Sequence, residues 1–302
     1  MTEQKPTEQK QTRPARPPRP QHVMDVVRRT QLTPSLVRLE LGGPGFSTFP
    51  ETPSTDAYVK LIFAKPELGL EPPYDLAHLR ETLPGEDVPV TRTYTVRWVD
   101  HDAGVLALDF VVHGDEGLAA PWARDAQPGD RIAFMGPGGA YSPDPQADWH
   151  LLAGDLSAVP AIAAALEAMP ADARGLAFLV VDSEEEQLEL TAPDGVEIIW
   201  TTGAESGAAT DLLVTAMQSR PWPEGRVQVF AHGERESIKL VRRLLKERGI
   251  ERDQISISGY WAHGRTEDRF QSEKREPIGK IDDCPPARAL TRSRGAPPST
   301  GS

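Results

Sequence analysis

The sequence predicts a protein of two domains, an antiparallel β-barrel followed by a doubly wound parallel sheet. The first half of the chain holds about six short strand-like runs separated by turns, with one small helix, which is typical of a closed antiparallel barrel. From about residue 149 onward, apolar strand-like runs alternate with helical segments, as they do in βαβ units. The 302 residues are enough for two domains of ordinary size.

The barrel elements are indicated by apolar and polar residues that alternate along each run. In chain order we expect two strands within 22–40, strands at 58–63, 92–99 and 105–112, a helix at 119–126 and a strand at 131–135. A Pro- and Gly-rich excursion from Lys65 to Pro89 interrupts this series, and the turn at 127–130 leads into its last strand.

The second domain is indicated by a change of texture near 140–148, where we place the seam. The run Leu176–Val181 is continuously apolar, as strands buried on both faces are. The amphipathic helix at 237–248 ends at Gly249. The remaining expected elements are strands at 149–153, 196–201, 227–231 and 255–258 and helices at 158–169 and 210–217.

Both ends of the chain differ in composition from the body. Residues 1–20 contain five prolines and no apolar periodicity, and residues 271–302 contain five prolines and a Ser-, Arg- and Gly-rich end. We therefore predict a disordered tail at 1–20, the barrel domain at 21–145, the α/β domain at 146–270, and a disordered or loosely docked tail at 271–302.

The charge of the body excludes several classes of partner. The two tails hold 11 of the 33 Lys and Arg and 6 of the 45 Asp and Glu, which leaves residues 21–270 with a formal charge of −17. Such a body repels nucleic acid and anionic lipid. The chain has no apolar run near eighteen residues and no hydrophobic signal segment, and its one cysteine is Cys284. We expect a cytoplasmic protein with no nucleic-acid partner and no insertion into the membrane.

The segment from Arg92 to Arg97 carries the clearest chemical pattern. In an extended strand Arg92 and Tyr94 project from the same face, and Thr95 follows at once. The set offers a cation for a diphosphate, an aromatic plane for a flat heterocycle and a small hydroxyl, which a flavin dinucleotide needs. The alternative is a half-buried barrel strand whose Arg and Tyr are satisfied within the protein.

Loops after the strands of the second domain form the other candidate site, since ligands of open α/β sheets bind beyond the carboxyl ends of the strands. The loop that begins with Gly154 and Asp155 opens a helix and could hold a pyrophosphate on its amides, although an ordinary turn looks the same. Asp182 and Glu184–Glu186 follow the second strand, where a carboxylate bonds a ribose 2′-hydroxyl, so they favour NADH over NADPH. The alternative is a solvated acidic loop.

Hydrolytic and metal sites are not indicated. The seven histidines form no His-x-x-x-His pair, and the chain has no Gly-x-Ser-x-Gly motif. His113 is expected to be structural or to contact a flavin phosphate, because hydride and electron transfer need no protein base.

Six segments in register resemble one family. They are Arg92–Arg97, Asp109–Asp115, Gln127–Asp130, Gly136–Gly139, Gly154–Asp155 with Pro160–Ile162, and Ser258–Trp261 with Gly264–Asp268. Over about residues 20–270 the chain is similar to the siderophore-interacting proteins, the ferric-siderophore reductases of the ferredoxin–NADP reductase superfamily.

The resemblance implies FAD in the barrel, NADH or NADPH on the second domain and a ferric siderophore at the flavin edge. It implies that Arg92 binds the FAD phosphates, that Tyr94 packs on the flavin, and that Thr95, the candidate catalytic residue, lies near flavin N5. The basic residue expected to face the siderophore is Lys60. The further candidate cofactor-binding residues are Thr93, Asp109, His113, Gly117, Leu118, Ala119, Ala120, Gly154, Asp155, Asp182 and Trp261.

The chain departs from the family pattern at two places. The diphosphate loop runs Gly117-Leu-Ala-Ala-Pro121, where relatives have a small hydroxyl or a Gly-Pro pair, so Ala120 offers no side-chain bond. After Tyr260 and Trp261 the chain has Ala262-His263 in place of the family's Arg, which leaves Arg265 and Arg97 as candidate cations for the substrate.

Three functions stay open from sequence. The leading hypothesis is an FAD enzyme that reduces a ferric siderophore with NAD(P)H and releases Fe(II), with NADH slightly favoured. The second is a general flavin, quinone or electron-transfer reductase of the same architecture. The third is a siderophore-binding protein with little turnover. A ferredoxin partner is possible but disfavoured, because ferredoxins are typically acidic and so is this body.

Overall fold

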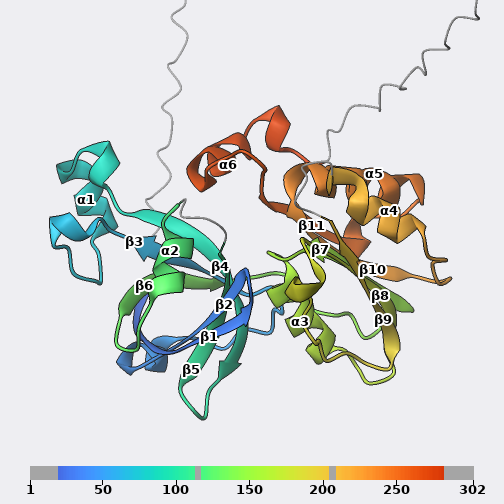
Figure 1. Ribbon diagram of the computed structural model, residues 1–302, viewed down its shortest axis with the longest axis horizontal. Coiled ribbons are helices and arrows are strands. Elements are labelled where there is room, and N and C mark those ends of the chain that lie inside the picture. The colour runs from blue at the N-terminus through green and yellow to red at the C-terminus, as the bar shows by residue number, and fades with distance from the viewer. Residues whose placement is uncertain (1–19, 113–116, 204–208, 282–302) are drawn as a thin grey trace, which may run out of the picture. The chain divides into compact units, whose positions relative to one another are not determined.

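The computed structural model describes residues 20–112, 117–203 and 209–281, and its contacts group them into two compact units. One unit holds residues 20–32 and 36–140, and the other holds residues 33–35 and 141 onward. The predicted fold class is confirmed, since the first unit is a closed barrel and the second is built on a five-stranded sheet (Figure 1).

The barrel contains six strands in the order β1-β2-β5-β4-β3-β6, and antiparallel pairing of β1 with β6 closes it. Alternate residues of the strands point inward and form one core, with Met24, Leu39, Leu61, Phe110 and Phe134 fully buried. The strands are β1 Gln21–Thr33, β2 Leu36–Gly42, β3 Tyr58–Phe63, β4 Val90–Asp100, β5 Val105–Val111 and β6 Arg131–Gly138.

Short helices occupy the connections of the barrel. The excursion after β3 contains α1 (Leu76–Thr82), which the sequence analysis did not predict, and the Asp75 side chain caps it by accepting a hydrogen bond from the His78 amide at 3.0 Å. The predicted helix before β6 is α2 (Ala119–Asp125). The remaining connections include the 3-10 turns Pro44–Thr48, Pro66–Leu68 and Gly85–Asp87.

The second unit has the parallel sheet expected of βαβ units, in the order β11-β10-β7-β8-β9. Its strands are β7 Trp149–Asp155, β8 Arg174–Val181, β9 Gly195–Thr202, β10 Val227–Glu234 and β11 Ile255–Trp261. Its first three helices are α3 Val159–Ala168, α4 Leu212–Gln218 and α5 Arg235–Glu247.

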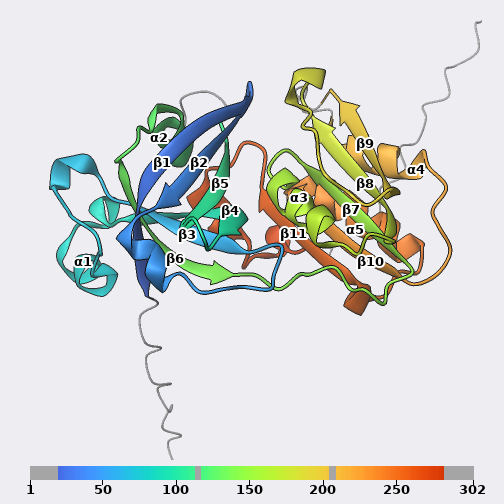
Figure 2. The same ribbon diagram turned by 90° about the horizontal axis from the view of Figure 1, so that it is seen from below.

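Helices cover both faces of this sheet (Figure 2). Leu152 and Phe230 pack with α3 on one face. Their neighbours Leu151 and Val229 pack with α4 and α5 on the other face. Burial on both faces explains why these strands lack the apolar–polar alternation of the barrel strands.

The second unit continues past residue 270, where we predicted its end. Helix α6 (Glu267–Glu273) crosses that boundary, and a 3-10 turn follows at Pro277–Gly279. Phe270 is fully buried, and Lys239 of α5 donates a hydrogen bond to the Ile278 carbonyl at 2.7 Å. The composition of the C-terminal end did not reveal this segment. The contacts that hold it in place are made with residues far away in the chain, and composition carries no information about them.

Among the described residues, no helix is both long enough and apolar enough to cross a membrane.

Candidate functional site

Strand β4 places the two predicted flavin contacts on one face of the barrel wall. Arg92 lies opposite Leu61 of β3, and Tyr94 lies opposite Val59. Leu61 and Val59 are fully buried in the barrel core, whereas Arg92 and Tyr94 are half-buried. The two side chains therefore lie on the core-facing side of β4, at positions where solvent still reaches them.

Tyr94 belongs to an aromatic group assembled from four elements. Its ring lies 4.3 Å from that of Phe110 in β5, at an interplanar angle of 35°. Trp122 of α2 contacts Phe110 at 5.9 Å and Phe63 of β3 at 5.8 Å, both edge to face. These contacts fix the plane of Tyr94 and tie α2 to the strand that carries it. The sequence analysis missed Trp122, although its signal was present as an aromatic residue in the helix after the predicted diphosphate loop.

The described part of that loop leaves open space. Gly117 has φ 85°, and among the described residues, its chain neighbours aside, no atom lies within 4 Å of the position a Cβ would take. Leu118 is exposed, Ala119 is buried and Ala120 is half-buried, while His113 lies outside the described residues. A half-buried guanidinium, a fixed aromatic plane and an open glycine-containing loop fit the diphosphate and the ring system of FAD.

The opposite face of β4 carries the other predicted residues of this strand. Thr93 lies opposite Lys60 of β3, and Thr95 lies opposite Tyr58. Thr95 is buried, and Lys60 is half-buried. Lys60, Thr93 and Thr95 thus share one face of the β3–β4 ladder. That Lys60 faces the siderophore stays a prediction.

Arg97 is the extra residue of a β-bulge. Val96 pairs with Leu108 of β5, and Trp98 pairs with the next residue, Ala107, so the register of this ladder skips Arg97. A bulge redirects the side chains at its position and is common beside functional sites. Whether Arg97 faces the substrate stays a prediction.

Asp109 is held by the barrel itself. Its carboxylate accepts two hydrogen bonds from Arg38 of β2, with Nε–Oδ1 at 2.6 Å and Nη2–Oδ2 at 2.7 Å, and the residue is 4% exposed. A bidentate, buried ion pair of this kind favours a structural role across the β2–β5 ladder over the predicted cofactor contact. Periodicity along the sequence could not reveal it, because the partner lies 71 residues away.

At the carboxyl edge of the parallel sheet, Asp155 uses both of its oxygens inside the protein. Oδ1 accepts hydrogen bonds from the amide and the hydroxyl of Ser157. Oδ2 accepts from the Glu234 amide at 2.7 Å and from the Trp261 indole Nε1 at 2.8 Å. Burial raises the pKa of Asp155, and the bonds from Ser157, Trp261 and Glu234 oppose that rise.

Gly154 owes its identity to packing. A Cβ at this position would lie 2.6 Å from both the Ala158 Cβ and the His232 carbonyl oxygen. Two amides of the predicted pyrophosphate cradle are also occupied, since Ser157 and Ala158 both donate to Asp155. The described hydrogen bonds therefore support a tight strand-to-helix turn here more than a preformed phosphate cradle.

The acidic loop after β8 divides into exposed and buried carboxylates. Asp182, Glu184 and Glu185 are exposed. Glu186 is only 3% exposed and accepts hydrogen bonds from the Thr33 hydroxyl and the Ser35 amide, which group with this unit. Glu186 is therefore unsuited to the predicted ribose contact, whereas Asp182 keeps a suitable place at the end of its strand.

Arg265, the second candidate substrate cation, is bound to a carboxylate. Its Nε lies 2.9 Å from Glu273 of α6, which also binds Arg235 at 2.6 Å and Arg269 at 3.0 Å. The hydrogen bond from Arg235, followed by those of the other two arginines, lowers the pKa of Glu273 to about 2. The three arginines around Glu273 outnumber this carboxylate, so positive charge remains in excess among these four residues. Arg265 is nevertheless oriented by Glu273, a contact that the sequence analysis did not predict.

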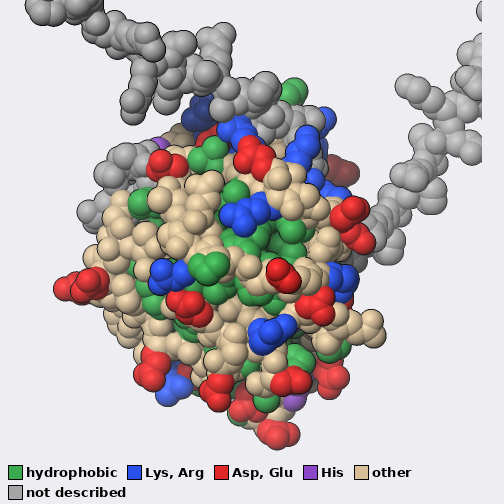
Figure 3. All heavy atoms as spheres, turned by 90° about the vertical axis from the view of Figure 1, so that its right-hand side faces the viewer, with side chains coloured by type: hydrophobic (Ala, Val, Ile, Leu, Met, Phe, Trp, Pro, Cys, Tyr) green, Lys and Arg blue, Asp and Glu red, His purple; other side chains and the backbone are tan. Residues whose placement is uncertain are grey.

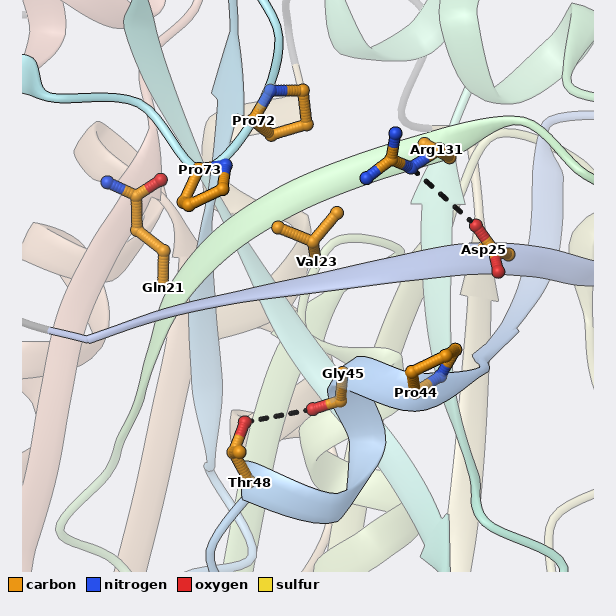
Figure 4. Close-up of a pocket in the computed structure, with 9 residues that line it drawn as sticks. All are labelled: Gln21, Val23, Asp25, Pro44, Gly45, Thr48, Pro72, Pro73 and Arg131. Atoms are coloured by element: carbon orange, nitrogen blue, oxygen red, sulfur yellow. Dashed lines mark hydrogen bonds and ion pairs between the residues drawn. The ribbon is translucent and has the colours of Figure 1, made fainter.

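A pocket of about 560 Å³ lies on the outer side of β1 and β6 (Figure 4). Its lining residues are Gln21, Val23, Asp25, Pro44, Gly45, Thr48, Pro72, Pro73 and Arg131. Arg131 lies 3.9 Å from Asp25, and the Thr48 hydroxyl donates to the Gly45 carbonyl at 3.0 Å. None of the described residues predicted to bind the cofactor or substrate lines it.

Comparisons with known proteins decide the family. The sequence pattern of the siderophore-interacting FAD-binding domain matches residues 25–141, and that of the siderophore-interacting protein matches residues 147–264. Ferric vibriobactin reductase ViuB of Vibrio cholerae is 36% identical over 83% of this chain and 93% of its own length. The chain belongs to the siderophore-interacting protein family.

A solved structure supports the same conclusion. A siderophore utilization protein from T. fusca is 39% identical, with a TM-score of 0.70 over 82% of this chain and 94% of its own. At the level of fold alone, the chain resembles a ferredoxin reductase of carbazole 1,9a-dioxygenase, at 18% identity and a TM-score of 0.56 over 82% of this chain and 70% of that one. The resemblance predicted from the six segments is confirmed, and the barrel is the family's FAD-binding domain.

Charge on one face of the molecule is mixed. On the face drawn in Figure 3, acidic and basic side chains are interspersed around apolar patches. The chain as a whole is acidic, with a formal net charge of −12.

Proposed function

We propose that this protein is a cytoplasmic, FAD-dependent reductase that passes electrons from NADH or NADPH to a ferric siderophore and releases Fe(II). Membership of the siderophore-interacting protein family and the 36% sequence identity to ferric vibriobactin reductase support an oxidoreductase of this class. The single observation that carries the proposal is strand β4, which joins Arg92 and Tyr94 on one face to Thr93 and Thr95, beside Lys60, on the other.

Each residue of β4 has a distinct task in this proposal. Arg92 would bind the FAD diphosphate through charge-assisted hydrogen bonds. Tyr94, held against Phe110, would provide a fixed plane for the ring system. Thr95 would offer a hydrogen bond from its hydroxyl or its backbone to the reacting edge of the flavin, near N5. When bound, FAD supplies the step from hydride transfer, in which two electrons move together, to the transfer of single electrons.

The substrate is proposed to meet the protein at Lys60. Ferric siderophores with catecholate or hydroxycarboxylate groups are often anions, which an acidic chain would repel without a local cation. Lys60 lies directly opposite Thr93 across the β3–β4 ladder, so its backbone is paired with the strand that carries the proposed flavin contacts. One nicotinamide nucleotide supplies two electrons, which reduce two ferric ions to Fe(II), and hard oxygen ligands hold Fe(II) less tightly than Fe(III).

We further propose NADH as the preferred reductant. The exposed carboxylate of Asp182 stands at the end of β8, where it could accept a hydrogen bond from a ribose 2′-hydroxyl, and Glu184 and Glu185 would repel a 2′-phosphate. Glu186 makes no contribution to this preference, because its carboxylate is buried.

Anaerobic spectroscopy tests the proposal. The purified protein should show flavin absorbance, which NADH or NADPH should bleach and a ferric siderophore should then restore, with Fe(II) trapped by a ferrous chelator. Bleaching without reoxidation by ferric siderophores, but with reoxidation by free flavin or quinones, would identify a general reductase. Siderophore binding without bleaching would identify a binding protein.

A further inference from the structure

We propose that Asp155 is a positioning residue that fixes the indole of Trp261 as one wall of the nicotinamide nucleotide site. The inference rests on the proposed function, because it concerns the reductant's site. The sequence predicts both residues as direct cofactor ligands, and their contacts separate the two roles.

Asp155 has little capacity left for a ligand. Its two oxygens already accept four hydrogen bonds, two from Ser157 and one each from Glu234 and Trp261. A phosphate would also be repelled by the carboxylate. Asp155 therefore connects the ends of three neighbouring strands, β7, β10 and β11.

The backbone around Asp155 is shaped to admit its carboxylate. Gly233 has φ 150°, and a Cβ there would lie 2.7 Å from Asp155 Oδ2. The next residue, Glu234, caps α5 by accepting from the amides of Glu236 and Ser237, and its other oxygen accepts from the His263 amide at 3.2 Å. Asp155 and Glu234 thus hold both ends of the segment Trp261–His263.

Trp261 combines a satisfied N–H with an exposed ring. Trp261 is 38% exposed and is one of the few large apolar residues exposed in the described part of the chain. The following residue, Ala262, is only 3% exposed. A single exposed apolar residue is ordinary on a protein surface. Here, however, the half-buried carboxylate of Asp155 fixes the indole at the edge of the sheet where nucleotides bind in this class of fold. A held aromatic plane at that edge suits stacking with a flat nicotinamide ring.

Isotope-edited NMR and kinetics on the FAD-loaded protein test the proposal. Trp261→Phe assigns the Trp261 indole cross-peak in a ¹H–¹⁵N spectrum and keeps an aromatic ring. Asp155→Asn keeps the shape of the side chain but turns an NH₂ group toward two donors. Trp222→Phe is the matched control, because its indole N–H also donates a 2.8 Å hydrogen bond, to the carbonyl of Met217 in α4.

We expect the Trp261 cross-peak to shift when NAD⁺ or NADP⁺ is added, and to move in Asp155→Asn before any nucleotide is added. The KM for the reducing nucleotide should rise about tenfold in Asp155→Asn and in Trp261→Phe, or ~1.4 kcal/mol, with a smaller change in kcat. Trp222→Phe should leave KM unchanged. If Asp155→Asn does not fold, Trp261→Phe tests the same bond from its other end.

An unchanged Trp261 cross-peak in folded Asp155→Asn would overturn the positioning role. A cross-peak that moves while KM stays constant in both variants would show that this indole is not part of the nucleotide site. If neither nucleotide bleaches the wild-type flavin, the proposed function fails, and the spectra still decide separately whether Asp155 holds Trp261.

Discussion

Replacing Arg92 by alanine should weaken FAD binding strongly while leaving the barrel folded. Arg92 lies on the core-facing side of β4 but is half-buried, and its Nη1 donates to the carbonyl of the adjacent Thr91 at 2.9 Å. A charge-assisted hydrogen bond to a diphosphate contributes about 1.5–3 kcal/mol. Its loss corresponds to an increase of about 10- to 150-fold in the Kd of FAD.

Two measurements separate cofactor loss from unfolding. FAD binding is reported by the ratio of flavin absorbance to protein absorbance and by the Kd of the apoprotein for FAD, measured from flavin fluorescence. The urea midpoint reports stability. Arg92→Lys should give an intermediate Kd, because an ammonium keeps the charge without the planar fork of the guanidinium.

Arg131→Ala is the matched control in the same barrel. Arg131 is 52% exposed and its carboxylate neighbours lie at 3.7 and 3.9 Å, so its removal should change neither flavin content nor stability appreciably. A full complement of FAD with an unchanged Kd in Arg92→Ala would refute the assignment of β4. Equal flavin loss in both variants would show that the effect is not specific to Arg92.

Four further results are expected. NADH should bleach the flavin at lower concentration than NADPH, measured by anaerobic titration, because the loop after β8 exposes carboxylates. Lys60→Ala should raise the KM for an anionic ferric siderophore several-fold while flavin bleaching keeps its rate, and Lys65→Ala, which removes an exposed ion pair, should change neither. Arg38→Met should cost about 3–5 kcal/mol in urea unfolding, because it leaves the buried Asp109 carboxylate unpaired. The free energy of unfolding should fall between pH 6.5 and about 3, by up to about 1.4 kcal/mol per pH unit, because burial lowers the pKa of His232 to about 3 and only the unfolded chain takes up its proton in this range.

Each of these expectations has a contradicting result. A clear preference for NADPH would show that the acidic loop does not contact the ribose. Equal losses in both half-reactions of Lys60→Ala would indicate a structural lysine. Wild-type stability of Arg38→Met would show that Asp109 is satisfied without Arg38, and an unchanged pH slope in His232→Phe would assign the acid sensitivity to other groups.

Local patterns were sufficient to predict the fold and the position of strand β4, the candidate flavin-binding strand. Alternation along β4 placed Arg92 and Tyr94 on one face, because this periodicity depends only on the extended backbone. Turn residues and the change from alternating to continuous apolar runs located the barrel and the parallel sheet.

Contacts between distant residues could not be predicted in the same way. The pairing of Asp109 with Arg38 and that of Glu186 with Thr33 depend on strand register and tertiary packing, which no spacing in the sequence encodes. The same is true of the three arginines that surround Glu273 and redirect Arg265. In each case a charged side chain expected to face a ligand, or to lie in solvent, is engaged by a partner elsewhere in the fold.

Anaerobic reoxidation of the reduced flavin by a ferric siderophore tests the central claim most directly. The protein is first bleached with one equivalent of NADH, and the ferric siderophore is then added in the presence of a ferrous chelator. The account predicts that flavin absorbance returns while two equivalents of Fe(II) chelate form for each reduced flavin, as the electron count requires. A flavin that stays reduced, with no Fe(II) chelate formed, would contradict it.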